Sequence, residues 1–235
     1  MLRLGYKASA EQFGPRQLLD YAVLADKLGY DSVWTSDHYQ PWRHTDGHAP
    51  NAIAWMGAAA MSTERVLLGT SVLTPTLRYN PAVVAQAFAT LGCLAPGRIA
   101  LGVGTGESLN EVVVGVEWPE QKERFHRLKE AVMLIQQLFR EEMVNFEGQY
   151  YTTHNATLYD RPDEPVPVFI GAAGPAASRL AGRIAEGYID TSGKASELYT
   201  EKLLPAVSEG LGKAGRADDA IERMIEMKVS FDTDR

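Results

Sequence analysis

Asp37 and His38 are adjacent and follow a short run of β-branched and aromatic residues, with Trp42 in the loop beyond them. A histidine changes its charge near neutral pH, and a neighbouring carboxylate tunes that change. This combination suits the removal of a proton from a substrate by His38. The alternative is that His38 only hydrogen-bonds within its loop, and the residues alone leave both interpretations open.

The same loop also carries two further histidines, His44 and His48, on either side of Asp46. This spacing could indicate two ligands of one bound metal ion. Metal sites of this kind need three or four ligands, and the sequence offers no convincing further ligand at helical spacing. We therefore expect no metal site.

The segment Gly102-Val-Gly-Thr-Gly-Glu107 closes another predicted strand and is superficially similar to a dinucleotide-binding motif. Its third glycine comes one residue too early, and the next strand is too distant for a compact nucleotide-binding unit. The glycines indicate instead that a flat ring system approaches the backbone. Glu107 is then a candidate to donate or accept a proton, or else a solvated glutamate at the start of a helix.

The segment Gly171-Ala-Ala-Gly-Pro-Ala-Ala177 is the strongest local indication of phosphate binding. Small residues expose backbone N–H groups, Pro175 can begin a helix, and helix N-termini attract phosphate. Glycine-rich turns also serve packing alone. Ser192-Gly-Lys194 adds a cation where an anionic substrate could bind, unless Lys194 is an ordinary surface residue.

These segments follow the strands of a repeating strand and helix pattern. The pattern predicts strands over 2–8, 32–36, 66–73, 98–103, 166–171, 187–191 and 225–231. It predicts helices over 15–28, 52–62, 81–94, 122–140, 176–184 and 199–214, and a β-hairpin over 144–151. Repeated β/α units favour a parallel sheet. Because polar residues and glycines gather after almost every strand, we favour a (β/α)8 TIM barrel over an open sheet, although only seven strands are present.

The amino-acid composition argues against some classes of binding partner. The chain has 235 residues, of which 45% are hydrophobic, and a formal net charge of −7, which suits one domain over 1–235. No block of lysine and arginine favours a nucleic acid, and no apolar run is long enough for a membrane span. Cys93 is the only cysteine, which is typical of a cytoplasmic protein, and its apolar neighbours predict a small buried side chain.

Longer stretches of the chain resemble a known family. One set consists of Leu28-Gly-Tyr-Asp-Ser-Val-Trp-Thr-Ser-Asp-His38, the hairpin at 146–151 and Pro167-Val-Phe-Ile-Gly-Ala-Ala-Gly-Pro175. A second set consists of residues 5–13, 37–43, 69–76, 78–81, 102–110, 191–194 and 197–202. On the first set the chain resembles the luciferase-like superfamily of flavin and deazaflavin barrels. On the second it resembles the F420-dependent glucose-6-phosphate dehydrogenases within that superfamily.

The resemblance implies hydride transfer from C1 of glucose 6-phosphate to C5 of coenzyme F420, an 8-hydroxy-5-deazaflavin. The products would be 6-phosphogluconolactone and reduced F420. The resemblance makes His38 the base that removes the C1 hydroxyl proton and places Trp42 beside the reacting carbon. Glu107 would lie near N1 of the ring, and Asp37 would hold both the cofactor and the histidine.

The same resemblance assigns the remaining contacts. A cis peptide bond would join Ser71 to Val72 against the deazaflavin. The implied cofactor-binding residues are Asp37, Ser71, Val72, Thr74, Gly106, Glu107, Asn110, Ala172, Ala173, Gly174 and Ala176. The implied substrate-binding residues are His38, Trp42 and Lys194, with Lys194 at the sugar phosphate.

The family members that the chain resembles continue with an eighth strand, flanking helices and two further basic phosphate ligands. We therefore expect a C-terminally incomplete barrel with a hairpin insertion near 141–165, unpaired edges on the first and seventh strands, and tighter binding of F420 than of glucose 6-phosphate. A homodimer is also expected. Two alternatives remain: another F420- or FMN-dependent luciferase-like oxidoreductase, and a non-catalytic F420-binding fragment.

Overall fold

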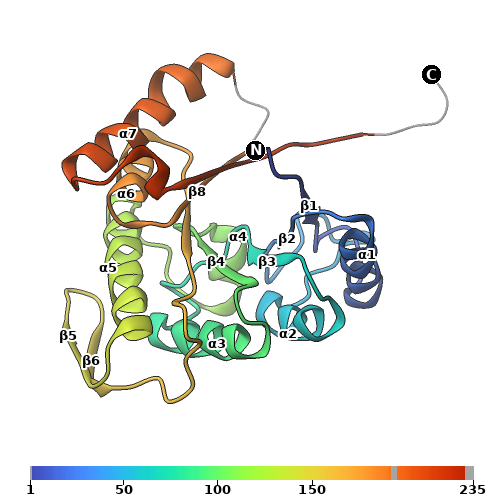
Figure 1. Ribbon diagram of the computed structural model, residues 1–235, viewed down its shortest axis with the longest axis horizontal. Coiled ribbons are helices and arrows are strands. Elements are labelled where there is room, and N and C mark those ends of the chain that lie inside the picture. The colour runs from blue at the N-terminus through green and yellow to red at the C-terminus, as the bar shows by residue number, and fades with distance from the viewer. Residues whose placement is uncertain (1, 192–194, 231–235) are drawn as a thin grey trace. The chain divides into compact units, whose positions relative to one another are not determined.

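The computed structural model describes residues 2–191 and 195–230. Within it the chain forms two compact units, Met1–Val168 and Phe169–Arg235. Figure 1 labels most of the helices and strands of both. Each unit is described by itself below.

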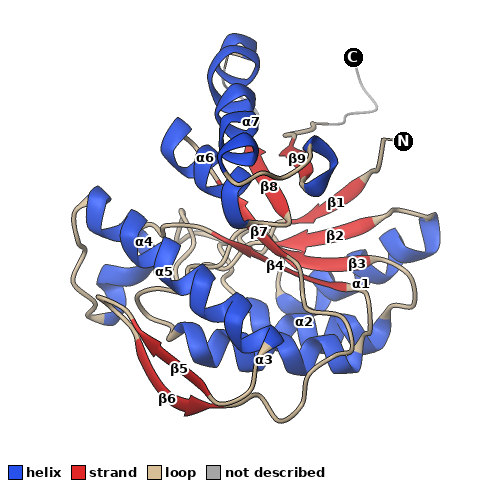
Figure 2. Cartoon of the chain, turned by 60° about the vertical axis from the view of Figure 1, so that its left-hand side comes forward, coloured by secondary structure: helices blue, strands red, loops and turns tan. Residues whose placement is uncertain are grey.

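The first unit is built on four parallel strands in the order β1-β2-β3-β4. The strands are β1 (Gly5–Ala8), β2 (Ser32–Thr35), β3 (Leu67–Thr70) and β4 (Ile99–Val103). Figure 2 shows them side by side, with α1, α2 and α3 along one face of the sheet. Every residue of β4 is buried, which is typical of a parallel strand covered on both faces. The carboxyl ends of the strands therefore gather at one edge of this sheet.

Three helices connect these strands, and local signals at their ends define them. They are α1 (Pro15–Leu28), α2 (Ala52–Ser62) and α3 (Pro81–Leu94). Asn51 caps α2 by accepting a hydrogen bond from the Ala54 N–H at 3.0 Å, and Asn80 caps α3 in the same way from Ala82 at 2.9 Å. Such side-chain caps satisfy N–H groups that have no partner inside the helix. The predicted bounds of all three helices are confirmed.

The long helix of this unit is α5 (Gln121–Arg140), and it follows the short helices α4 (Ser108–Glu111) and η1 (Val112–Val114). Apolar residues spaced by three or four form a buried stripe on this helix at Leu128, Val132, Ile135 and Leu138, whereas Phe125, in the first turns, is only half-buried. The hairpin predicted over 144–151 is present but longer, because its strands are the antiparallel β5 (Val144–Glu147) and β6 (Thr152–Ala156), and the second strand follows Tyr151.

The second unit contains parallel strands in the order β7-β8-β9 with helices between them. Its elements are β7 (Val168–Gly171), α6 (Pro175–Ile184), β8 (Gly187–Thr191), the π-helical turn η2 (Leu198–Leu203), α7 (Leu204–Lys213), η3 (Asp218–Ala220) and β9 (Glu222–Glu226). Helices α6 and α7 pack against each other. The predicted helix over 199–214 therefore begins as a π-helical turn.

Two predictions are corrected by the structure. The last strand was expected over 225–231, but β9 ends at Glu226, because its pairing with β8 begins where Glu222 faces Gly187. Met227 and Val229, which lie within the expected strand, are 70% and 85% exposed, and Phe231 lies outside the described residues. Cys93, predicted to be buried, is exposed because it lies on the outer face of α3.

Among the described residues, no helix is both long enough and apolar enough to cross a membrane.

Candidate active site

His38 lies just beyond the carboxyl end of β2 and contacts two glutamates. Its Nδ1 is 2.7 Å from Oε1 of Glu11, and neither atom has a closer polar partner or a regular hydrogen bond among the described residues. Its Nε2 lies 3.8 Å from Oε2 of Glu107. The His38 side chain is 13% exposed. The imidazole is thus held from its buried side, and Nε2 is directed toward the more exposed Glu107.

Glu11 contacts His38 but was not among the site residues predicted from the sequence. Burial alone would raise the pKa of Glu11, but polar contacts with His38 and Ser36 and the charge of His38 lower it from 4.5 to about 2. An ionised carboxylate can only accept hydrogen bonds, so it favours the proton of His38 on Nδ1 and leaves Nε2 free to accept another. The position of Glu11 just after β1 is the signal that could have revealed it.

Replacing Glu11 with glutamine should remove a pH-dependent part of the stability. Because the folded-state pKa of Glu11 lies below 4.5, its carboxylate stabilises the fold above pH 4.5, and this contribution is lost as the pH falls toward about 2. The urea midpoint of the original chain should exceed that of E11Q above pH 4.5, and the difference should close at lower pH. The exposed Glu147→Gln variant is the control and should show no difference. A constant gap between the original chain and E11Q would contradict the prediction.

Trp42 and Glu107 flank the exposed side of His38. The indole of Trp42 stacks on the imidazole with a centroid distance of 5.8 Å and an interplanar angle of 29°, and Trp42 is 67% exposed. Glu107 precedes α4 and makes no side-chain capping bond. An apolar ring and an accessible carboxylate therefore border Nε2, so three residues predicted from the sequence come together at one point.

Asp37 belongs to a buried charge cluster with Arg78 and Glu111. The Arg78 guanidinium bonds to both carboxylates, and its Nη2 also donates to the backbone oxygen of Asp37 at 3.1 Å. Asp37 is 4% exposed and Glu111 is fully buried. Burial raises the pKa of Asp37, while the Arg78 guanidinium opposes that effect. Neither Arg78 nor Glu111 was predicted as a site residue, although the 78–81 motif contains the arginine.

The loops after β3 and β4 meet at two glycines. A cis peptide bond joins Ser71 to Val72, as predicted. A Cβ atom at Gly104 would lie 2.6 Å from Val72 Cγ2, and one at Gly106, where φ is 86°, would lie 2.9 Å from Thr74 Cγ2. Both positions therefore require glycine, because another residue would push the two loops apart.

Asn110, predicted to contact the cofactor, supports a neighbouring loop through its side chain. Its Oδ1 accepts a hydrogen bond from the N–H of Tyr39 at 2.9 Å and a longer one from Gln40 at 3.4 Å. The residue is 3% exposed. Asn110 thus holds the loop that leads from His38 to Trp42.

In the second unit, the predicted phosphate-binding turn lies at the start of α6. Gly174 precedes the helix without a side-chain capping bond, and Pro175 begins it. Ala173 and Ala176 are exposed, whereas Ala172 is 4% exposed and its N–H donates to Ile189 O at 3.0 Å. Among the described residues, no side chain caps the N–H groups in the first turn of α6. Lys194, with Ser192 and Gly193, lies outside the described residues.

No group of three or more histidine, cysteine, aspartate or glutamate side chains suited to a metal occurs within residues 2–191 and 195–230. His44 lies close to Gln40, with 3.3 Å between His44 Nε2 and Gln40 Nε2.

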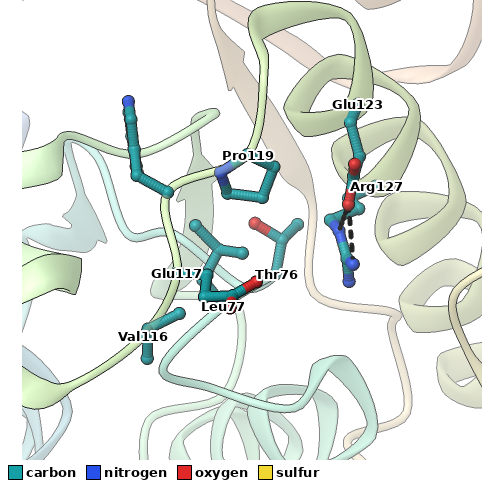
Figure 3. A pocket seen from close by; sticks show the side chains of 8 residues that line it. Thr76, Leu77, Val116, Glu117, Pro119, Glu123 and Arg127 are labelled. Carbon is teal, nitrogen blue, oxygen red and sulfur yellow. Dashed lines mark hydrogen bonds and ion pairs between the residues drawn. The ribbon is translucent and has the colours of Figure 1, made fainter.

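A cavity of about 300 Å³ opens elsewhere in the first unit, between Thr76, Trp118 and Arg127, and it does not include His38 (Figure 3).

Parallel β/α units with a histidine and carboxylates beyond the strand ends define a barrel-type enzyme site. The family model described as luciferase-like monooxygenase matches residues 2–235, so the chain belongs to the luciferase-like family. The predicted superfamily and TIM-barrel fold class are thereby confirmed.

Individual relatives share a high sequence identity with the chain. The chain is 66% identical over 234 residues to a Nakamurella multipartita protein named F420-dependent glucose-6-phosphate dehydrogenase, covering 100% of this chain and 69% of the relative. A Microbacterium testaceum protein of the same name is 64% identical, with 99% and 69% covered.

Solved structures show the same likeness. An F420-dependent secondary alcohol dehydrogenase in complex with an F420–acetone adduct superposes with a TM-score of 0.91 at 39% identity, covering 95% of this chain and 68% of that one. The F420-dependent tetrahydromethanopterin reductase of Methanopyrus kandleri has a TM-score of 0.81 at 23% identity over 95% of this chain and 65% of that one, and supports the fold alone.

Proposed function

We propose that this chain is an oxidoreductase that transfers a hydride from C1 of glucose 6-phosphate to C5 of coenzyme F420, giving 6-phosphogluconolactone and reduced F420. The observation that carries the proposal is His38 held between Glu11 and Glu107 in a chain 66% identical to a protein named for this activity. Oxidation of the C1 hydroxyl group to a lactone releases one hydride and one proton. His38 provides a place for the proton.

The proposal gives a separate task to each side chain near the reacting atoms. His38 Nε2 accepts the proton of the C1 hydroxyl group, and ionised Glu11 stabilises the imidazolium that results. Trp42 forms an apolar wall on the imidazole and restricts water near the reacting carbon. Glu107 would lie at the cofactor ring and would give it the proton that balances the charge of the incoming hydride.

The residues present fit a deazaflavin. Gly104 and Gly106 carry no side chain where they pack against Val72 and Thr74, so a flat ring can approach the backbone there, and the uncapped start of α6 suits a phosphate. When bound, the deazaflavin supplies a carbon, C5, that accepts a hydride. The residues proposed to hold it are Asp37, Ser71, Val72, Thr74, Gly106, Glu107, Asn110, Ala172, Ala173, Gly174 and Ala176. His38, Trp42 and Lys194 are proposed to hold the substrate, with Lys194 at its phosphate.

The direct test is titration of the chain with F420, followed by glucose 6-phosphate, with loss of F420 fluorescence as the measure of reduction. We expect saturable F420 binding and fluorescence loss only when glucose 6-phosphate is present. Tight FMN binding without F420 binding would favour an FMN-dependent relative. F420 binding without turnover would favour a non-catalytic role, and turnover only with other alcohols would favour another F420-dependent dehydrogenase.

Replacing Glu107 with glutamine should reduce kcat by about tenfold while changing the F420 Kd much less. The amide keeps the shape of Glu107 but cannot exchange a proton. The exposed Glu120→Gln variant is the matched control and should leave both quantities unchanged. Equal losses in kcat and in F420 affinity would limit Glu107 to cofactor binding, with no part in the proton transfer.

The proposal includes a homodimer formed through α2 and α3. Neither helix contains a charged residue, yet Met61, Val83 and Leu94 are 68%, 58% and 48% exposed. Exposed apolar surface of this kind is typical of a protein interface, and a measurement of the mass in solution tests for the dimer.

A cytoplasmic location is also proposed, because Cys93, the only cysteine, is unpaired.

A further inference from the structure

Residues 71–78, which follow β3, form what we call the β3 loop. Its first part carries Ser71, Val72 and Thr74, which the proposed function places against the cofactor. Its last residue, Arg78, is held by the buried carboxylates of Asp37 and Glu111. The middle of the loop needs a separate restraint if the first part is to keep its position.

Thr76, at the middle of the loop, is not held by its own side chain. It is 3% exposed, and its Oγ1 has no hydrogen-bond partner among the described residues. Thr76 and Leu77 also border the cavity of about 300 Å³, and Figure 3 shows them beside Pro119 and Glu117 at this open space. Close packing on that side therefore does not prevent the loop from moving.

A restraint comes from the β5–β6 hairpin. The hydroxyl group of Tyr151 donates to the backbone oxygen of Thr76 at 2.7 Å, across 75 residues of sequence. Burial raises the pKa of Tyr151 to about 12, against an opposing effect of Arg127, so the hydroxyl remains a donor.

The hairpin turn is itself fixed to α5. The Glu130 carboxylate accepts hydrogen bonds from three consecutive N–H groups, those of Gln149, Tyr150 and Tyr151, at 2.9, 2.8 and 2.7 Å. The Arg127 guanidinium lies 4.5 Å from the centroid of the Tyr150 ring and pairs with Glu123, the pair joined by dashed lines in Figure 3. Tyr151 therefore presents its hydroxyl from a rigid support.

We propose that Tyr151 is a positioning residue for the cofactor: its bond to the Thr76 carbonyl holds the β3 loop, and thereby Thr74, in the conformation that binds F420. The proposal rests on the proposed function, because it concerns the same cofactor. Under this proposal the hairpin supports the cofactor site, although no hairpin residue was among the predicted site residues.

The test compares Tyr151→Phe with the original chain by F420 fluorescence titration, steady-state kinetics and thermal unfolding. Loss of the hydrogen bond to the Thr76 carbonyl should raise the F420 Kd and the KM for F420 about two- to tenfold, while kcat at saturating F420 changes less than twofold. The melting temperature should fall by only a few degrees. This split between KM and kcat distinguishes positioning of the cofactor from participation in the chemistry.

Tyr150→Phe is the matched control, because it removes a hydroxyl group from the same turn and keeps the ring that stacks on Arg127. Its F420 Kd should equal that of the original chain. Equal affinities for Y151F and the original chain, equal losses in both variants, or a Y151F protein that fails to fold would each overturn the proposal. Failure of the original chain to bind F420 would instead overturn the proposed function itself, so the two failures are distinguishable.

Discussion

Replacing His38 with alanine should lower kcat for F420 reduction by about 10²- to 10⁴-fold, the usual effect of removing a general base. His38 is the residue whose Nε2 faces the exposed side of the site while Glu11 holds Nδ1. Without the imidazole, the proton of the C1 hydroxyl group has no acceptor at this point. Because the proposed cofactor-binding residues are unchanged, the F420 Kd should change by no more than a few-fold.

The control for this experiment is His44→Ala. His44 lies in the same loop, is exposed, and contacts Gln40 rather than the His38 cluster. Its kcat should match that of the original chain. A His38→Ala variant that keeps its kcat within a few-fold would reject His38 as the base. Loss of F420 binding as large as the loss of kcat would assign His38 to binding.

Replacing Arg78 with methionine should lower the free energy of unfolding by about 3–5 kcal/mol, the usual cost of removing one partner from a buried ion pair. The Arg78 guanidinium is bonded to Asp37 and Glu111, and the three side chains are 9%, 2% and 0% exposed. Methionine fills much of the same volume but leaves two buried carboxylates without a counter-charge. Urea unfolding near neutral pH measures the difference.

A surface pair gives the matched comparison. Arg16 lies 3.6 Å from Asp20 on α1, and their side chains are 87% and 64% exposed. Arg16→Met should cost less than about 0.5 kcal/mol, because water solvates both charges whether or not they are paired. Adding Asp37→Asn and Glu111→Gln to Arg78→Met should recover part of the lost stability. Similar unfolding free energies for the Arg78 and Arg16 variants would contradict a structural role for the cluster.

Local sequence was sufficient to predict the helices of the first unit. Pro15, Asn51 and Asn80 occur at or just before the first residues of α1, α2 and α3, and their effects act within a turn of the helix. The stripe of α5 also follows from spacing along one helix. The end of the last strand could not be predicted in this way, because its pairing with β8 determines it and the apolar residues beyond Glu226 remain exposed.

The sequence likewise predicted where the candidate catalytic side chains would gather. In a parallel sheet the carboxyl ends of the strands lie at one edge, so His38 after β2 and Glu107 after β4 were expected near each other, and they lie 3.8 Å apart. The resemblance to a family supplied the chemical roles, which residue types alone had left open.

Only the tertiary structure revealed the residues that hold this site in place. Glu11 contacts His38 from the loop after another strand, Arg78 reaches Asp37 and Glu111 across 41 and 33 residues, and Tyr151 reaches Thr76 across 75. A glutamate, arginine or tyrosine in such loops has no periodicity or capping pattern that marks its partner. The physical reason is that these contacts depend on which loops meet after the strands have paired and the hairpin has packed on α5, whereas a sequence pattern carries information only about neighbours within one element.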